Sequence, residues 1–81
     1  MIKKRIEIIM SEELLEQPFL YRLVKDHDLV PGVRGATVKN KEACMQIELQ
    51  GGSEEQINGG IDYLLELGVT VKSLEGDFVE S

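Results

Sequence analysis

Residues 17–39 read QPFLYRLVKDHDLVPGVRGATVK and predict a helix, a tight connection and a strand in succession. Pro18 suits the first helical position, because a proline there loses no helical hydrogen bond. Five residues at helical spacing form the predicted apolar face: Phe19, Leu20, Leu23, Val24 and His27. We expect the helix to end near Asp28, because Pro31 disfavours a helical conformation at the residue before it.

The connection leads into a strand over residues 33–39, which Gly35 interrupts. Val33 and Val38 are an odd number of residues apart, so a regular strand would place them on opposite faces. A bulge at Gly35 would reconcile them, and so would a strand with apolar groups on both faces.

Three further strands are predicted from the alternation of apolar and polar residues, over residues 3–10, 43–49 and 69–74. Asn40 and Lys41 form a candidate tight hairpin before the second of these. The predicted buried faces comprise Ile6, Ile8 and Met10 in the first strand and Met45, Ile47 and Leu49 in the second.

A second helix is predicted to begin after Ser53, which serves as the N-cap, with Gln56 completing a capping box. Gly68 supplies the stop at its C-terminal end. Its predicted buried stripe is Ile57, Ile61, Leu64 and Leu65. Gly60 lies on that side, where it costs about 1 kcal/mol against alanine and therefore suggests close packing against the sheet.

The resulting order, strand–helix–strand–strand–helix–strand, predicts an α+β fold of the ferredoxin-like βαββαβ type. Right-handed crossovers place both helices on one face of a four-stranded antiparallel sheet. We expect one domain over residues 1–81, with a core at about 3–74 and a frayed acidic tail at 75–81. The uncovered face is predicted to carry Arg5, Glu7, Ile9, Cys44, Gln46, Glu48, Thr70 and Lys72.

Charge and cysteine content exclude several functional classes. The formal net charge of −6 argues against nucleic acids and anionic membrane surfaces as partners. The single cysteine, Cys44, excludes an internal disulfide and a site of several thiolates, and it favours a reduced, cytoplasmic setting. No apolar run reaches the roughly 18 residues of a transmembrane helix, and the charged N-terminus does not resemble a signal peptide.

No residue pattern indicates catalysis. Asp26, His27 and Asp28 are adjacent, so on a helix they would point in different directions instead of converging on a metal. A lone histidine and a strand cysteine offer no third partner for nucleophilic chemistry. We therefore predict a protein that is not an enzyme and that has no cofactor and no metal.

Several features of the chain occur together in one known family: Pro18 before YRLVKD, Gly35 in the second strand, and the segments IELQG, SEEQ and YLLELGVTV. On these features, residues 4–74 resemble the NIL domain family. The Asn-Ile-Leu motif that names the family should fall at about residues 31–33, where this chain has Pro-Gly-Val and the asparagine is missing.

NIL domains form the C-terminal regulatory part of methionine-importer ATPases, and others accompany ferredoxin modules in proteins of sulfur metabolism. The resemblance implies a regulatory module that senses a sulfur amino acid such as methionine at a dimer interface. The candidate ligand-binding residues are Gly32, Val33, Arg34 and Gly35. The guanidinium of Arg34 could meet a ligand carboxylate. The alternative is a protein–protein interaction adaptor of sulfur or methionine metabolism or transport, which has no small ligand and docks through Ile9 and the acidic surface.

The uncovered sheet face further predicts a homodimer. The candidate interface residues are Arg5, Glu7, Ile9, Cys44, Gln46, Glu48 and Lys72. Two-fold symmetry would let a basic residue of one chain meet an acidic residue of the other, and association would bury additional apolar area. The competing interpretation is a monomer that keeps this face for another partner.

Overall fold

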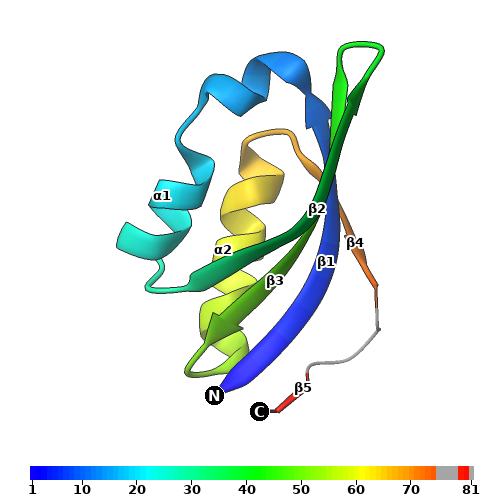
Figure 1. Cartoon of the computed structure of the whole chain (residues 1–81). Helices are drawn as coiled ribbons and strands as arrows, with labels where there is room; N and C mark the ends of the chain where they lie inside the picture. The colour runs from blue at the N-terminus through cyan, green and yellow to red at the C-terminus, as the bar shows by residue number, and fades with distance from the viewer. Residues whose placement is uncertain (75–78, 81) are drawn as a thin grey trace.

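The computed structural model of the chain describes residues 1–74 and 79–80. Its elements are β1 (Ile2–Ser11), the 3-10 helix η1 (Glu12–Glu16), α1 (Phe19–Lys25), β2 (Val30–Lys39), β3 (Glu42–Gly51), α2 (Glu54–Glu66), β4 (Thr70–Ser73) and β5 (Val79–Glu80). The main sheet has the strand order β2-β3-β1-β4, and each adjacent pair is antiparallel. Both α-helices lie on the same side of this sheet (Figure 1). The predicted ferredoxin-like α+β fold is therefore confirmed.

β1 lies in the middle of the sheet and pairs with three other strands. One edge of β1 pairs with β3 along its whole length, whereas the other edge is shared by β4 and β5. β4 pairs with residues 6–9, and β5 pairs with Ile2 and Lys3. Where the sequence predicts a frayed tail, Val79–Glu80 instead pair with β1, and the rest of that tail lies outside the described residues.

The buried faces of β1 and β3 alternate as the sequence predicts. The core lies between the sheet and the helices and comprises Ile6, Ile8, Met10, Phe19, Leu23, Leu29, Ala43, Met45, Ile47, Leu49, Ile57, Leu64 and Val69. Asn40 and Lys41 join β2 to β3 with φ angles of 54° and 63°. Two consecutive residues with positive φ are typical of the tight hairpin turn whose twist matches that of the strands, so this prediction is confirmed.

The apolar face of α1 is narrower than predicted. Phe19 and Leu23, one turn apart, are buried, and Leu20 is half-buried. Pro18 is the N-cap instead of the first helical residue. Val24, which we expected on the apolar face, is 49% exposed because it lies about 100° around the helix from Leu23.

The stripe of α2 shows a similar difference. Ile57, Gly60 and Leu64 are buried and Ile61 is half-buried. Leu65, however, is 51% exposed, contrary to the prediction, because it lies about 100° past Leu64 around the helix.

Two glycines shape α2. A Cβ atom placed on Gly60 would collide with Cδ1 of Leu29 and would lie 3.2 Å from Cδ2 of Leu23. The close packing predicted at Gly60 is therefore present, although its neighbours belong to α1 and the connection after it. Gly68 has a φ of +92° and follows the helix end, as the sequence predicts for a C-terminal stop.

Gln56 joins the start of α2 to the end of α1. Ser53 Oγ accepts a hydrogen bond from the backbone N–H of Gln56 at 3.1 Å, which confirms the predicted N-cap. The Gln56 side chain accepts from the N–H of Gly52 at 2.9 Å and donates to the carbonyl oxygens of His27 and Asp28 at 3.0 and 2.7 Å. One amide thus satisfies three backbone groups from two connections, the one after α1 and the one before α2, and joins the two helices.

Candidate functional site

A bulge in β2 decides how the candidate ligand-binding residues are presented. The register of β2 against β3 shifts between Val33 and Gly35, which leaves Arg34 as the extra residue. The predicted bulge is therefore confirmed. Because of it, Val33 and Val38 both stand opposite buried residues of β3 and point to the helix side of the sheet.

The same bulge divides the four candidate residues between the two faces. Gly32 pairs with Glu48, and Gly35 pairs with Gln46, so both glycines belong to the side of the sheet that neither α-helix covers (Figure 1), which we call the open face. The Arg34 side chain also reaches this face, where Nη2 is 3.8 Å from Oε2 of Glu48. Val33 faces the helix side instead and is separated from the other three.

Gly32 and Gly35 leave β2 without side chains on the open face next to β3. The atom nearest to a Cβ placed on Gly32 would be the Glu48 carbonyl oxygen, at 3.9 Å. A Cβ on Gly35 would lie 2.8 Å from Oε1 of Gln46, so the Gln46 amide rests over the Gly35 backbone. This glycine strip, formed by Gly32 and Gly35, is bordered by the polar groups of Arg34, Gln46 and Glu48.

Glu48 is held by cations from both neighbouring strands. Nε of Arg5 on β1 donates a hydrogen bond to Oε2 of Glu48 at 3.1 Å. This bond, with the nearby charges of Arg34 and Lys3, keeps the pKa of Glu48 below its usual value, although burial acts in the opposite direction. Glu48 is therefore ionised at neutral pH and lies among three cations.

A second polar group on the open face includes Cys44. Nε2 of Gln46 donates to Oε2 of Glu7 at 3.0 Å. That hydrogen bond and one from Cys44 lower the pKa of Glu7, and the charge of Lys72 adds to the effect. Burial, followed by the hydrogen bond and negative charge of Glu7, raises the pKa of the Cys44 thiol. The raised pKa lowers the fraction of thiolate, which is the nucleophilic form of cysteine.

The predicted interface residues share the open face through their cross-strand pairing: Arg5 with Glu48, Glu7 with Gln46 and Lys72, and Ile9 with Cys44. We expected a basic residue of one chain to meet an acidic residue of the other, but Arg5 and Glu48 form such an ion pair within one chain. Ile9 is half-buried and does not project as an exposed apolar residue.

Sequence reasoning missed an apolar patch at the edge of the sheet. Val33 and Val38 are 50% and 52% exposed on the helix side of β2, because the short helix α1 does not cover this strand fully. The predicted bulge could have revealed this patch, because a bulge at Gly35 places both valines on one face of the strand.

The Asp26-His27-Asp28 segment has structural contacts. Asp26 Oδ2 accepts from Nη1 of Arg22 at 3.2 Å, and the His27 ring lies 5.4 Å from that of Tyr63. No group of three or more His, Cys, Asp or Glu residues within the described ranges is arranged to hold a metal ion. None of the helices in that part of the chain has the length and apolar character needed to cross a membrane.

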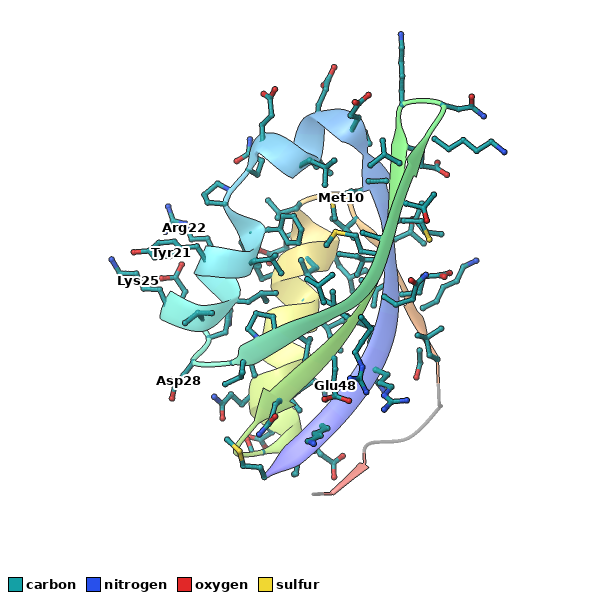
Figure 2. The ribbon with its side chains drawn as sticks, viewed as in Figure 1. Met10, Tyr21, Arg22, Lys25, Asp28 and Glu48 are labelled. Carbon is teal, nitrogen blue, oxygen red and sulfur yellow. The ribbon has the colours of Figure 1, made fainter. Side chains whose placement is uncertain are left out.

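The outer surface of α1 lies on the opposite side of the molecule from the sheet. Tyr21, Arg22 and Lys25 project there, away from the strand that carries Glu48 (Figure 2). Nζ of Lys25 lies 5.6 Å from the centroid of the Tyr21 ring. This surface is far enough from the glycine strip to serve as a control region.

Comparison with known proteins gives one family match and several structural likenesses. The NIL domain model matches residues 4–73. No curated protein matches the sequence. Among solved structures, the C-terminal domain of an ABC transporter ATP-binding protein from Enterococcus faecalis has a TM-score of 0.70 at 17% identity, covering 91% of this chain and 86% of that one.

Two further solved structures share the fold. Prephenate dehydratase from Streptococcus mutans has a TM-score of 0.63 at 13% identity, covering 90% of this chain and 41% of that one. The C-terminal domain of the MgtC protein from Mycobacterium tuberculosis has a TM-score of 0.55 at 12% identity, covering 93% of this chain and 89% of that one. At these identities the likeness concerns the fold alone.

Proposed function

The chain belongs to the NIL domain family, and on that premise we propose that this regulatory-type domain binds a sulfur amino acid such as methionine on its open face, between two copies of the chain. In this role the module acts without catalysis and lies in the cytoplasm. It changes the behaviour of a transporter or enzyme of sulfur metabolism according to whether the ligand is bound.

The observation that carries the proposal is the position of Arg34 beside the glycine strip. The Arg34 side chain is 55% exposed, and its planar guanidinium offers the paired donors that suit a carboxylate. Neither Gly32 nor Gly35 has a side chain there, and although the Gln46 amide covers Gly35, the nearest atom to the Cβ position of Gly32 is the Glu48 carbonyl oxygen at 3.9 Å. A small ligand could therefore lie against the backbone of β2 while its carboxylate meets Arg34.

The dimer in this proposal follows from the charge balance of the open face. Arg5 and Glu48 already neutralise each other within one chain, and Glu7 has Gln46 and Lys72 as partners. Pairing two such faces would therefore bury both carboxylates together with their partners, and neither would become an isolated charge, whose cost would otherwise oppose association. A ligand held between the faces would add to their contact area.

Calorimetric titration with methionine, homocysteine and cysteine tests ligand binding, and light scattering at micromolar protein concentration tests the dimer. We expect heat and a raised melting temperature with at least one amino acid, and a dimer mass. Arg34→Ala should abolish the heat, whereas Lys25→Ala, on the outer surface of α1, should not. Absence of heat and of any thermal shift with all three amino acids would remove the ligand from the proposal, and a monomer mass would remove the dimer.

The second candidate function is a protein–protein adaptor that binds no small ligand. The observation that favours it is the exposed apolar patch formed by Val33 and Val38 on the edge strand β2. Edge strands with apolar side chains are prone to pair with another chain. Pull-downs from an extract of the source cells should then recover a protein of sulfur or methionine metabolism or transport with the wild type and lose it with Val38→Lys or Ile9→Glu. Equal recovery by all three proteins would exclude both the edge and the open face as its docking surface.

A further inference from the structure

The Glu48 carboxylate uses only one of its two oxygens for the contacts described above. Arg5 Nε and Arg34 Nη2 both approach Oε2, at 3.1 and 3.8 Å. Within the described residues, Oε1 of Glu48 accepts no hydrogen bond. Because an ionised carboxylate can accept hydrogen bonds at both oxygens, Glu48 retains an acceptor for a cationic group.

Arg34 is the complementary donor. Its distance of 3.8 Å to Glu48 is too long for a hydrogen bond, although it counts as an ion pair. In the part of the chain that the structure describes, the Arg34 guanidinium donates no hydrogen bond, so its donors are available to a ligand. The weak pairing costs little to rearrange when a ligand carboxylate arrives, since exposed ion pairs contribute at most about 1 kcal/mol.

A further acceptor lies beside the glycine strip. Gln46 uses its Nε2 group to bind Glu7 and Cys44, and its Oε1 rests over the backbone of Gly35. Within the described ranges this Oε1 accepts no hydrogen bond. Two acceptors on β3 therefore border the glycine strip: the Gln46 amide oxygen lies over Gly35, and the Glu48 carboxylate lies 3.8 Å from the Arg34 guanidinium.

We propose that Arg34 and Glu48 form a clamp for the two charged groups of a free α-amino acid, with Arg34 binding the carboxylate and Glu48, assisted by Gln46, binding the ammonium group. The two groups of an α-amino acid are attached to the same carbon, so they require partners only a few ångströms apart, as Arg34 and Glu48 are. The clamp rests on the proposed ligand-binding function and deepens it, because it assigns selectivity for the zwitterion and adds β3 residues to the site.

Titration of the purified chain with three probes tests the clamp. The probes are L-methionine, 4-(methylthio)butanoic acid, which lacks the ammonium group, and 3-(methylthio)propylamine, which lacks the carboxylate. We expect L-methionine to bind at least about tenfold more tightly than either analogue, since each lost charge-assisted contact corresponds to about a tenfold change or more. Equal binding of the acid or the amine would overturn the clamp without any variant.

Two substitutions test which residue binds the carboxylate of the ligand and which binds its ammonium group. Arg34→Gln should weaken binding of L-methionine and of the acid about tenfold or more while leaving the amine unaffected. Glu48→Gln should weaken binding of L-methionine and of the amine, leaving the acid unaffected, and its remaining amide oxygen still accepts from Arg5. The control variants are Arg22→Gln and Asp26→Asn, because these residues form an exposed Arg–Asp ion pair at 3.2 Å on α1, away from the open face (Figure 2).

The outcomes separate the clamp from the proposed function. If the wild type binds L-methionine but neither Arg34→Gln nor Glu48→Gln changes its affinity, the clamp is wrong and the ligand-binding function stands. If the wild type binds none of the three probes while remaining folded by circular dichroism, the methionine-binding function fails and the clamp fails with it.

Discussion

The two faces of β3 are formed by alternate residues of one strand, and the side chains on each face make different kinds of contact. Met45, Ile47 and Leu49 point toward the helices and are at most 9% exposed. Cys44, Gln46 and Glu48 point the other way and are joined to side chains of β1 by hydrogen bonds and charge. The helix side therefore contributes stability through burial, whereas the open face contributes positioned polar groups, which are what a ligand can recognise.

The largest expected effect comes from removing a side chain on the helix side. Ile47→Ala should lower the free energy of unfolding by about 2–5 kcal/mol, because Ile47 is fully buried and the space left cannot collapse completely. Gln46→Ala, at the neighbouring position, should cost about 1 kcal/mol, the value of a typical hydrogen bond. Urea unfolding of both variants measures the difference. Similar losses would show that the open face contributes to stability as much as the core.

Gly59 and Gly60 are adjacent on α2, and replacing each with alanine should have opposite effects on stability. Gly60→Ala should lower the free energy of unfolding by about 1–3 kcal/mol through overpacking, because the new methyl collides with Leu29. Gly59→Ala should raise it by up to about 1 kcal/mol, because its methyl would lie 3.7 Å from Nδ1 of His27, an ordinary contact, and alanine favours the helix. Thermal melts should therefore shift in opposite directions. A stabilising Gly60→Ala would contradict the close packing.

The smallest expected effect is a loss of folding stability at low pH, which we expect to arise from the two carboxylates on the open face. The pKa values of Glu7 and Glu48 are lower in the folded chain than the ordinary value of 4.5, so the unfolded chain binds protons more readily. Stability from these groups is present above that value and is lost as the pH falls through the lowered folded pKa values. Glu48→Gln should therefore show a smaller loss of stability on acidification than the wild type.

Urea midpoints at neutral pH and at about pH 3 measure this loss. Asp62→Asn, on the exposed side of α2, is the matched control and should follow the wild type. If the acid-induced loss in Glu48→Gln equals that of the wild type, the Arg5 contact does not stabilise the folded chain through Glu48.

The order of the elements and the buried faces of β1 and β3 could be predicted from the sequence, because an alternating strand with one covered face leaves little choice. The helix faces could be predicted only approximately. Leucines and valines at helical spacing define a broad apolar stripe on each helix. Which residues at the margins of that stripe are buried depends on the element packed against the helix. Close packing at Gly60 buries Leu23 and Leu29 and leaves Val24 and Leu65 outside.

Family resemblance indicates residues 32–35 as the candidate ligand segment. Which face of the sheet each of these residues lies on depends on the register of β2 against β3. A one-residue shift exchanges the two faces of a strand. The sequence predicted the bulge as one of two possibilities, but not that Arg34 would be the extra residue or that Glu48 would stand opposite Gly32. For that reason Val33 separates from its three neighbours, and Glu48 was expected at an interface and not beside the ligand.

The reactivity of the Cys44 thiol can show whether the open face is covered. It is the only cysteine in the chain, so a thiol-specific reagent such as a maleimide labels a single known position. Because burial and Glu7 raise the pKa of its thiol, labelling is slow at neutral pH and accelerates in alkali. Any second copy or partner that covers Cys44 slows it further. The dependence of the labelling rate on protein concentration therefore measures the occupancy of this face in the unmodified sequence, without an engineered probe.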